Sequence, residues 1–258
     1  MVVTTRLLKQ ASLFIIFLII VGGGLVATGR ALHDPTPTPT PDPRELLAPL
    51  IITDTYLFQV ANNDYDFLAQ VQNPNETYGA GSVTYRLSFF DEAGTPVSQK
   101  TNTFYILPGQ TKFVIETPLR FASPISKAEM KITGVQWQEL DPLALIGVDL
   151  VVTNEQFQKR TGPTIFGVVS GIVNNTSDFD VSSVQVVIVL LDAKDIPVAA
   201  NRTEIRTFLA DTRRGFESSW TAPLTVSVSK TYVEANTNLF LNDTFIRAHG
   251  GQEQFQTY

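Results

Sequence analysis

The chain has 258 residues, of which 43% are hydrophobic, and its 19 basic and 25 acidic side chains give a net charge of −6. This length suits two domains of about 100 residues each and a tether, because single domains cluster at about 100–150 residues. The chain has no cysteine, which excludes disulfides, cysteine-bound zinc, a thiol nucleophile and a lipid-modified cysteine. The basic residues are scattered, whereas nucleic-acid binding requires clustered cations, so we expect no nucleic-acid partner.

Residues 1–30 are predicted to form a cytoplasmic tip and a transmembrane anchor. Arg6 and Lys9 precede an apolar run over residues 11–27. A helix of this length reaches about 25 Å, at the short end of what spans a bilayer. Because positive residues stay on the cytoplasmic side, we expect a single-pass protein with a cytoplasmic N-terminus and extracytoplasmic C-terminal domains. The alternative is a signal peptide cleaved near Ala31, which would yield a secreted protein.

Residues 31–45 are predicted to be a linker, in which proline alternates with threonine. Proline fixes φ and removes a backbone donor, so the segment favours an extended polyproline stalk over a helix or a strand. At about 3.1 Å per residue, such a stalk would hold the following domains roughly 30 Å from the membrane.

Short alternating strand patterns separated by turns fill the rest of the chain. They predict two domains, at residues 46–140 and 141–248, followed by a tail at 249–258. The strands predicted for the first domain are 56–60, 67–71, 83–90, 101–106, 112–115 and 130–137, and those for the second are 148–153, 165–173, 184–191, 202–208, 215–220, 231–234 and 239–241. Their spacing, with no amphipathic helix after the anchor, predicts an all-β fold of two tandem immunoglobulin-like antiparallel β-sandwiches.

An internal repeat relates the two domains. The segment 82–91 (SVTYRLSFFD) is similar to the segment 183–192 (SVQVVIVLLD), which lies 101 positions later. The same offset relates Pro96 to Pro197. A repeat of roughly this length suits one small β-sandwich. We therefore expect the two segments to be equivalent central strands, with every second side chain pointing into a core.

Inward positions in the first copy are predicted at Val83, Tyr85, Leu87 and Phe89. Asp91 should leave the strand in an Asx-type turn with Gly94. By the repeat, Phe89 and Leu190 should occupy equivalent buried sites.

The segment Leu87-Ser88-Phe89-Phe90-Asp91, followed by Gly94 and Pro96-Val97, resembles the FxLYD family of bacterial and archaeal extracytoplasmic domains. Asn73-Pro74-Asn75 before it and Leu107-Pro108-Gly109-Gln110 after it also look like that family's pattern. Both copies lack the leading aromatic residue and the tyrosine, and the second copy resembles the family less closely. The resemblance implies an immunoglobulin-like sandwich on a membrane tether and implies no catalytic residue.

Candidate catalytic and metal sites are few. The loop pairs Asp64 with Asp66 and Asp178 with Asp180 could supply oxygen ligands to calcium, but neither is followed by the glycine and distal glutamate of a helix-loop-helix site. Turn chemistry is the alternative, and we expect no metal site.

Nucleophilic catalysis lacks its usual parts. The two histidines, His33 and His249, lie outside the predicted cores, and the chain has no Gly-x-Ser-x-Gly turn. We therefore expect a protein that is not an enzyme, with no catalytic residue and no cofactor.

The outward face of the central strand differs between the copies. It is mostly polar in the first copy, whereas the second presents Val187, Val189 and Leu191. Apolar side chains opposite the core should be covered by something. We predict either a loop or extra strand of the chain itself, such as residues 250–258, or a docking face for a partner or a second copy.

Together these features predict a non-enzymatic, membrane-anchored cell-surface or envelope protein that uses tandem domains for protein binding or scaffolding. Its expected partners are the lipid bilayer, through residues 11–27, and another protein or a second copy of itself. One alternative is an accessory subunit of an envelope export or transport complex, in which Gly22-Gly23-Gly24 would allow close helix approach. A glycan-processing enzyme is a further alternative.

Overall fold

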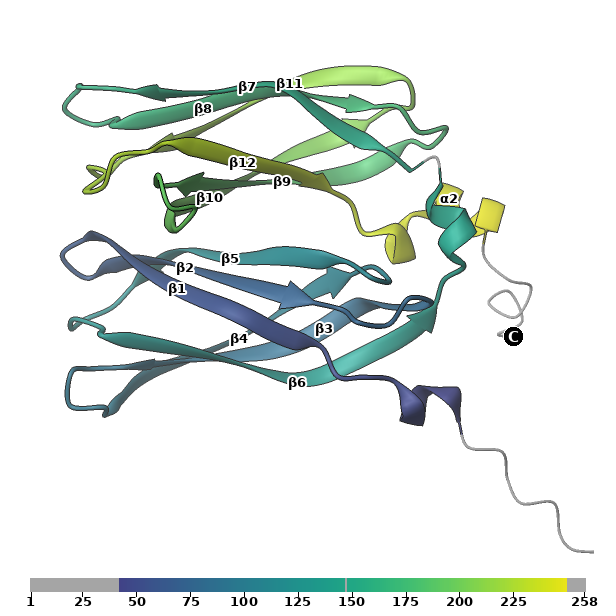
Figure 1. The fold of residues 1–258 in the computed structure, drawn as a ribbon, viewed down its shortest axis with the longest axis horizontal. Helices are drawn as coiled ribbons and strands as arrows, with labels where there is room; N and C mark the ends of the chain where they lie inside the picture. Colours follow the sequence, from purple (N-terminus) through teal and green to yellow (C-terminus); the bar gives the residue numbers. More distant parts are fainter. Residues whose placement is uncertain (1–41, 147, 250–258) are drawn as a thin grey trace, which may run out of the picture. The chain divides into compact units, whose positions relative to one another are not determined.

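The computed structural model describes residues 42–146 and 148–249. The predicted anchor, residues 31–41 of the predicted linker and residues 250–258 of the predicted tail lie outside the described residues. Within the described part, no helix is long and apolar enough to cross a membrane. That part is nearly all β and forms four three-stranded antiparallel sheets, which confirms the all-β prediction (Figure 1).

Six strands form the first sandwich. They are β1 (Ile51–Ala61), β2 (Asp64–Gln72), β3 (Tyr78–Phe90), β4 (Pro96–Ile106), β5 (Thr111–Arg120) and β6 (Lys127–Glu139). One sheet has the order β1-β2-β5, and the other has the order β4-β3-β6. Buried apolar side chains of both sheets, among them Phe67, Leu87 and Phe89, make up a single core.

Six further strands form the second sandwich. They are β7 (Leu150–Lys159), β8 (Gly167–Asn175), β9 (Val181–Leu191), β10 (Pro197–Phe208), β11 (Thr212–Trp220) and β12 (Lys230–Asn236). The sheets β11-β8-β7 and β10-β9-β12 repeat the order of the first sandwich, with each strand number raised by six. Pro96 and Pro197 begin equivalent strands, as do Thr111 and Thr212, so the spacing of 101 residues seen in the sequence recurs in the fold.

Short helical segments connect and end these units. They are η1 (Pro43–Leu46), η2 (Pro142–Leu145), η3 (Leu239–Leu241) and α2 (Asp243–His249). The strand predicted at 239–241 is therefore wrong. The side chain of Asn238 accepts the backbone N–H of Phe240 at 3.2 Å, and that of Asn242 accepts the N–H of Phe245 at 2.9 Å. These two caps start helical turns where hydrophobicity alone indicated a strand.

The central strands β3 and β9 bury alternate residues as the repeat predicts. Their core-facing side chains are at most 1% exposed and comprise Val83, Tyr85, Leu87 and Phe89 in β3 and Val184, Val186, Ile188 and Leu190 in β9. Phe89 and Leu190 therefore occupy equivalent positions in the two cores.

An Asx-type turn follows each central strand. The carboxylates of Asp91 and Asp192 accept the backbone N–H four residues later, at 2.8 and 2.9 Å. Gly94 has φ +77°, and Asp195 takes the same place in the second copy with φ 62°. Aspartate is one of the few residues besides glycine that adopt this left-handed conformation readily, so the second copy dispenses with the glycine.

A buried asparagine organises one end of each sandwich. Asn73 is 1% exposed, and its side-chain amide donates to the carbonyl oxygens of Tyr78 and Leu107 at 2.7 and 2.9 Å. Asn175 repeats this pattern, with its amide donors 2.8 and 3.1 Å from carbonyl oxygens of the equivalent segments. Each side chain thus satisfies backbone groups that lie outside the sheet ladders.

Candidate binding groove between the two sandwiches

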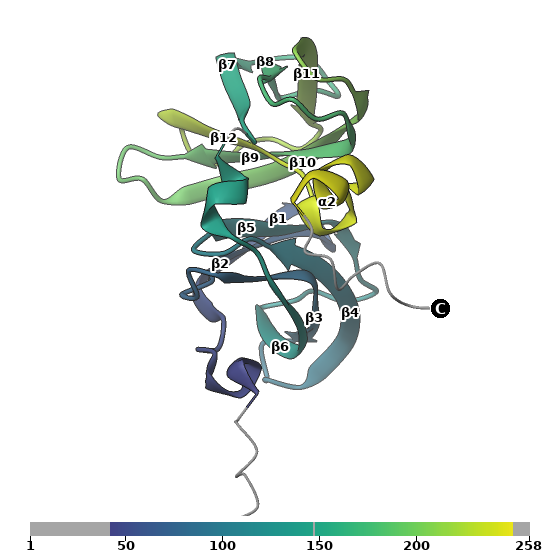
Figure 2. The same ribbon diagram turned by 90° about the vertical axis from the view of Figure 1, so that its right-hand side faces the viewer.

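The predicted docking face lies buried within the chain. Val187 and Val189 are 1% and 0% exposed, and Leu191 is partly buried. They belong to one apolar cluster with Leu68 and Ile115 of the first sandwich. Figures 1 and 2 show sheet β10-β9-β12 beside sheet β1-β2-β5. The sequence predicted that a loop, an added strand, a partner or a second copy would cover this face, whereas in the structure the first sandwich of the same chain covers it.

Aromatic side chains surround the buried cluster. Tyr56 and Phe58 of β1 stack with ring centroids 6.2 Å apart, and Phe113 of β5 forms a T-shaped pair with Tyr232 of β12, with ring centroids 5.3 Å apart. Such aromatic pairs contribute about 0.5–1.5 kcal/mol beyond the burial of their area. The contact between the sandwiches is therefore a packed apolar interface.

Hydrogen bonds extend this interface toward η3. Gln110 Nε2 donates to Asn236 Oδ1 at 3.0 Å, and Asn238 Nδ2 donates to the carbonyl oxygen of Gly81 at 3.1 Å. A Cβ atom at Gly81 would lie 2.9 Å from Cβ of Phe240, so only glycine permits η3 to approach β3 this closely. These contacts fix the end of the second sandwich against β3 and the β4–β5 turn.

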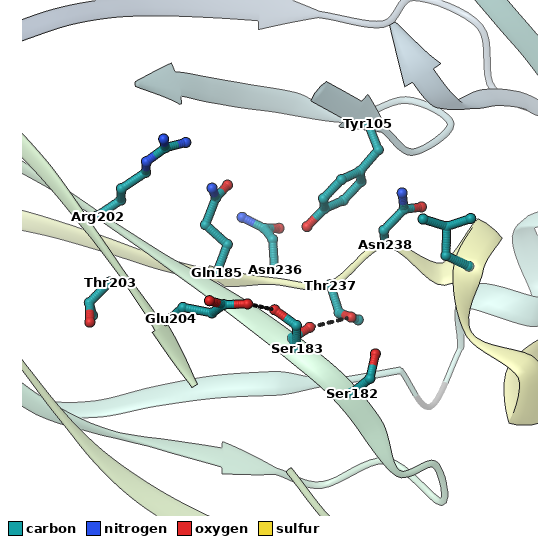
Figure 3. Close-up of a pocket in the computed structure, with 11 residues that line it drawn as sticks. Tyr105, Ser182, Ser183, Gln185, Arg202, Thr203, Glu204, Asn236, Thr237 and Asn238 are labelled. Carbon is teal, nitrogen blue, oxygen red and sulfur yellow. Dashed lines mark hydrogen bonds between the residues drawn. The ribbon is translucent and has the colours of Figure 1, made fainter. Parts of the chain in front are cut away.

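A groove of about 540 Å³ lies beside this interface, where β9, β10, β12 and η3 face Tyr105 of β4. In Figure 3, Gln185, Arg202 and Asn236 point toward the strands of the first sandwich, and the Tyr105 ring extends toward them. Nearly all the lining side chains are polar: Tyr105, Ser182, Ser183, Gln185, Arg202, Thr203, Glu204, Asn236, Thr237, Asn238 and Leu241. Because amides and hydroxyls both donate and accept hydrogen bonds, the groove suits a ligand that does both.

Hydrogen bonds hold part of the groove's wall in place. The Ser183 hydroxyl donates to Glu204, and the Thr237 hydroxyl donates to the carbonyl oxygen of Ser183 at 2.8 Å (Figure 3). Arg206 Nε donates to the other oxygen of Glu204 at 3.0 Å. Hydrogen bonds from Ser183 and then from Arg206 hold the pKa of Glu204 below its usual value. This carboxylate is therefore ionised and already paired.

A smaller cavity of about 110 Å³ adjoins the groove, and Tyr105, Gln185 and Arg202 line both. Lys112 lines the cavity and is 1% exposed, and its Nζ has no hydrogen-bond partner among the described residues. The ammonium lies 3.2 Å from the centroid of the Tyr105 ring, which is a cation–π contact. Burial lowers the pKa of Lys112 to about 7, against an opposing effect of Glu234.

This buried amine makes stability depend on pH. In the unfolded chain a lysine has a pKa near 10.4, so between about pH 7 and 9.5 the unfolded state binds more protons than the folded state. The free energy of unfolding should therefore rise by about 2–3 kcal/mol over that interval. Lys112→Met should remove the rise, whereas Lys194→Met, at an exposed turn, should retain it. Urea unfolding at several pH values measures this, and equal slopes in the two variants would contradict it.

A second buried charge lies where β3, β4 and β5 meet. Glu116 is 1% exposed and accepts hydrogen bonds from Lys100 Nζ at 2.6 Å, from Asn102 Nδ2 at 2.7 Å and from the Tyr85 hydroxyl. Burial acts to raise the pKa of Glu116, but these hydrogen bonds outweigh it and hold the pKa below its usual value. Since its oxygens are occupied, we interpret Glu116 as a group that joins the two sheets of the first sandwich.

Three of the four aspartates considered for calcium have partners within the chain. Asp64 lies 3.5 Å from Arg120 Nε, Asp66 accepts the Thr117 hydroxyl, and Asp180 accepts a backbone N–H of the β10–β11 turn at 2.8 Å. The described ranges contain no group of three histidine, cysteine, aspartate or glutamate side chains that could hold a metal ion.

Sequence reasoning did not find the groove or the adjoining cavity. Their central residues come from five strands and lie far apart in the sequence: Tyr105, Lys112, Gln185, Arg202 and Asn236. One signal was present, because Lys112 and Glu116 occupy positions of β5 that alternate with the outward-facing Phe113 and Ile115. Charged residues at the core-facing positions of a strand are rarely buried unless they are paired, so they indicate a buried polar site.

Comparison with known proteins found no family model and no curated protein that matches the chain. Among solved structures, it is similar to a transglutaminase from red sea bream, with 11% sequence identity and a TM-score of 0.23. That alignment covers 78% of this chain and 32% of the transglutaminase, so the chain spans about a third of that protein's length.

Proposed function

We propose that this chain is a non-enzymatic, membrane-anchored cell-surface or envelope protein that binds an extended polypeptide segment in the groove between its sandwiches. The observation that carries the proposal is the groove itself, about 540 Å³ in volume and lined almost wholly by polar side chains. An extended segment exposes a backbone donor and acceptor at each residue, and a side-chain amide such as that of Gln185 matches both.

The packing between the sandwiches supports a binding role. The apolar cluster of Leu68, Ile115, Val187 and Val189 holds the two walls of the groove in a fixed relation. A preformed site avoids the cost of ordering its walls when the ligand binds, which favours affinity. Tyrosine and arginine, present here as Tyr105 and Arg202, are the residue types that dominate binding energy at protein interfaces.

The N-terminal pattern supports the proposed location. An apolar run at residues 11–27 with cationic residues before it is typical of an anchor with a cytoplasmic N-terminus. The proline-rich residues that follow would act as a spacer, so that the groove would be presented outside the membrane. The resemblance to the FxLYD family, which consists of extracytoplasmic domains, agrees with this location.

Site-specific crosslinking in the native membrane tests the groove. A photoreactive benzoylphenylalanine in place of Thr203 should form a covalent product with a partner polypeptide. Ser182→Trp places a large ring in the groove and should remove most of that product. Ser98→Trp, on the exposed part of β4, is the matched control and should leave the product unchanged. The same product in both tryptophan variants would rule out the groove as the binding site.

A further inference from the structure

The small cavity beside the groove contains buried donors without acceptors. Lys112 Nζ and the Tyr105 hydroxyl are both buried, and neither has a hydrogen-bond partner among the described residues. Buried polar groups are nearly always hydrogen-bonded, and an isolated charge is the most costly of them to bury. The cation–π contact with Tyr105 compensates the ammonium only in part. Two such groups in one cavity wall indicate a ligand that accepts hydrogen bonds.

The charges around the cavity favour an anion. Lys112 lines it from β5, and Arg202 lines it from β10. Glu234 of β12 lies near enough to raise the pKa of Lys112, but the two side chains form no ion pair. The Glu234 carboxylate instead accepts hydrogen bonds from Tyr232 and Asn236. The charge of Glu116 is already matched by Lys100, at 2.6 Å. One positive charge thus remains uncompensated around this cavity.

We propose that this cavity is a carboxylate subsite, in which Lys112 and Arg202 bind an acidic side chain of the polypeptide segment that occupies the groove. A cavity of about 110 Å³ is large enough to accommodate a carboxylate group. Guanidinium groups bind carboxylates through two parallel hydrogen bonds, and Gln185 offers a further amide donor. The identity of the ligand rests on the proposed function, whereas the subsite itself would also bind a free carboxylate.

Binding at this subsite is coupled to a proton. Burial lowers the pKa of Lys112 to about 7, and a carboxylate beside the amine favours its charged form. Burial raises the pKa values of Tyr85 and Tyr105 above their usual range, so both rings stay neutral. The other charged side chains around this group are Arg202, Glu234 and Glu116, and hydrogen bonds hold the pKa of Glu116 below its usual value. The affinity for a carboxylate should fall about tenfold per pH unit above 7.

Acetate titration of the full chain in detergent micelles tests the subsite. With lysine labelled by ¹³C at the ε carbon, the Lys112 signal should shift saturably with acetate and not with chloride at equal ionic strength. Arg202→Gln and Lys112→Met should each weaken acetate binding about tenfold or more, and Lys194→Met should not change it. Arg202 is exposed, so its variant tests the subsite even if Lys112→Met fails to fold.

A peptide comparison then tests the source of the carboxylate. An amidated peptide with one central glutamate should bind at least about tenfold more tightly than the same peptide with glutamine, and Ser182→Trp should block the peptide but not acetate. The subsite would be overturned if acetate binding is not saturable, or if acetate binds equally well to the unchanged chain and to Lys112→Met. It would also be overturned if the affinity for acetate is equal at pH 6 and pH 8.5. Saturable acetate binding with equal affinities for the two peptides would overturn the assignment to an acidic side chain.

Discussion

Val189→Lys should lower the free energy of unfolding by several kcal/mol, because it places an ammonium group in a fully buried apolar cluster. Val189 is 0% exposed, and Leu68 and Ile115 of the same cluster offer no acceptor for the new charge. Urea unfolding of the full chain measures the effect.

Ser88→Lys is the matched control for this change. Ser88 holds the same position in β3 that Val189 holds in β9, but it is only partly buried, and the outward face of β3 is polar. Lysine there should change stability by no more than about 0.5 kcal/mol. Equal losses in the two variants would show that Val189 does not lie under the first sandwich.

Phe89→Ala and Leu190→Ala should each cost roughly 2–5 kcal/mol, as large-to-small changes in a core do. Phe89 is 1% exposed and Leu190 is 0% exposed, and each lies in the main core of its own sandwich. Leu209→Ala is a suitable control because Leu209 is 47% exposed, so its loss should be well below 1 kcal/mol. A loss below about 0.5 kcal/mol at Phe89 or Leu190 would contradict the equivalence of the two strands.

The strands and the core-facing positions of β3 and β9 were predictable because their signals are local. In β3 and β9 alternate apolar residues face a core, and the aspartate after each strand closes a turn through its own side chain. Such patterns depend on neighbours within a few residues, which the sequence shows directly. The segment 239–241 was predicted wrongly because its hydrophobicity alone was weighed, whereas the cap that Asn238 supplies starts a helical turn there.

The residues that pack over Val187, Val189 and Leu191 could not be predicted from such local patterns. The sequence shows that this face is apolar, but the side chains that cover it lie in β2 and β5, more than 70 residues earlier in the chain. One indication was available, because β2 has consecutive apolar residues at Phe67, Leu68 and Ala69. A strand that is apolar on both faces is buried on both faces. Two such strands in one chain, β2 and β9, were candidates to face each other.

The groove and its adjoining cavity depend on the same long-range contact. Lys112 and Tyr105 belong to the first sandwich, whereas Gln185 and Arg202 belong to the second. No spacing along the chain relates these residues, so only the packing of the sandwiches brings them together. The site therefore forms only if the two sandwiches pack through their apolar faces.

Methyl nuclear Overhauser effects in the full chain, with isoleucine, leucine and valine methyl groups labelled, test that packing most directly. Cross-peaks should join the methyl groups of Leu68 and Ile115 with those of Val187 and Val189, because all four belong to one buried cluster. Cross-peaks among the methyl groups within each core serve as the control. If the core cross-peaks appear and those between the sandwiches do not, the apolar faces are not in contact, and the groove between them does not exist in solution.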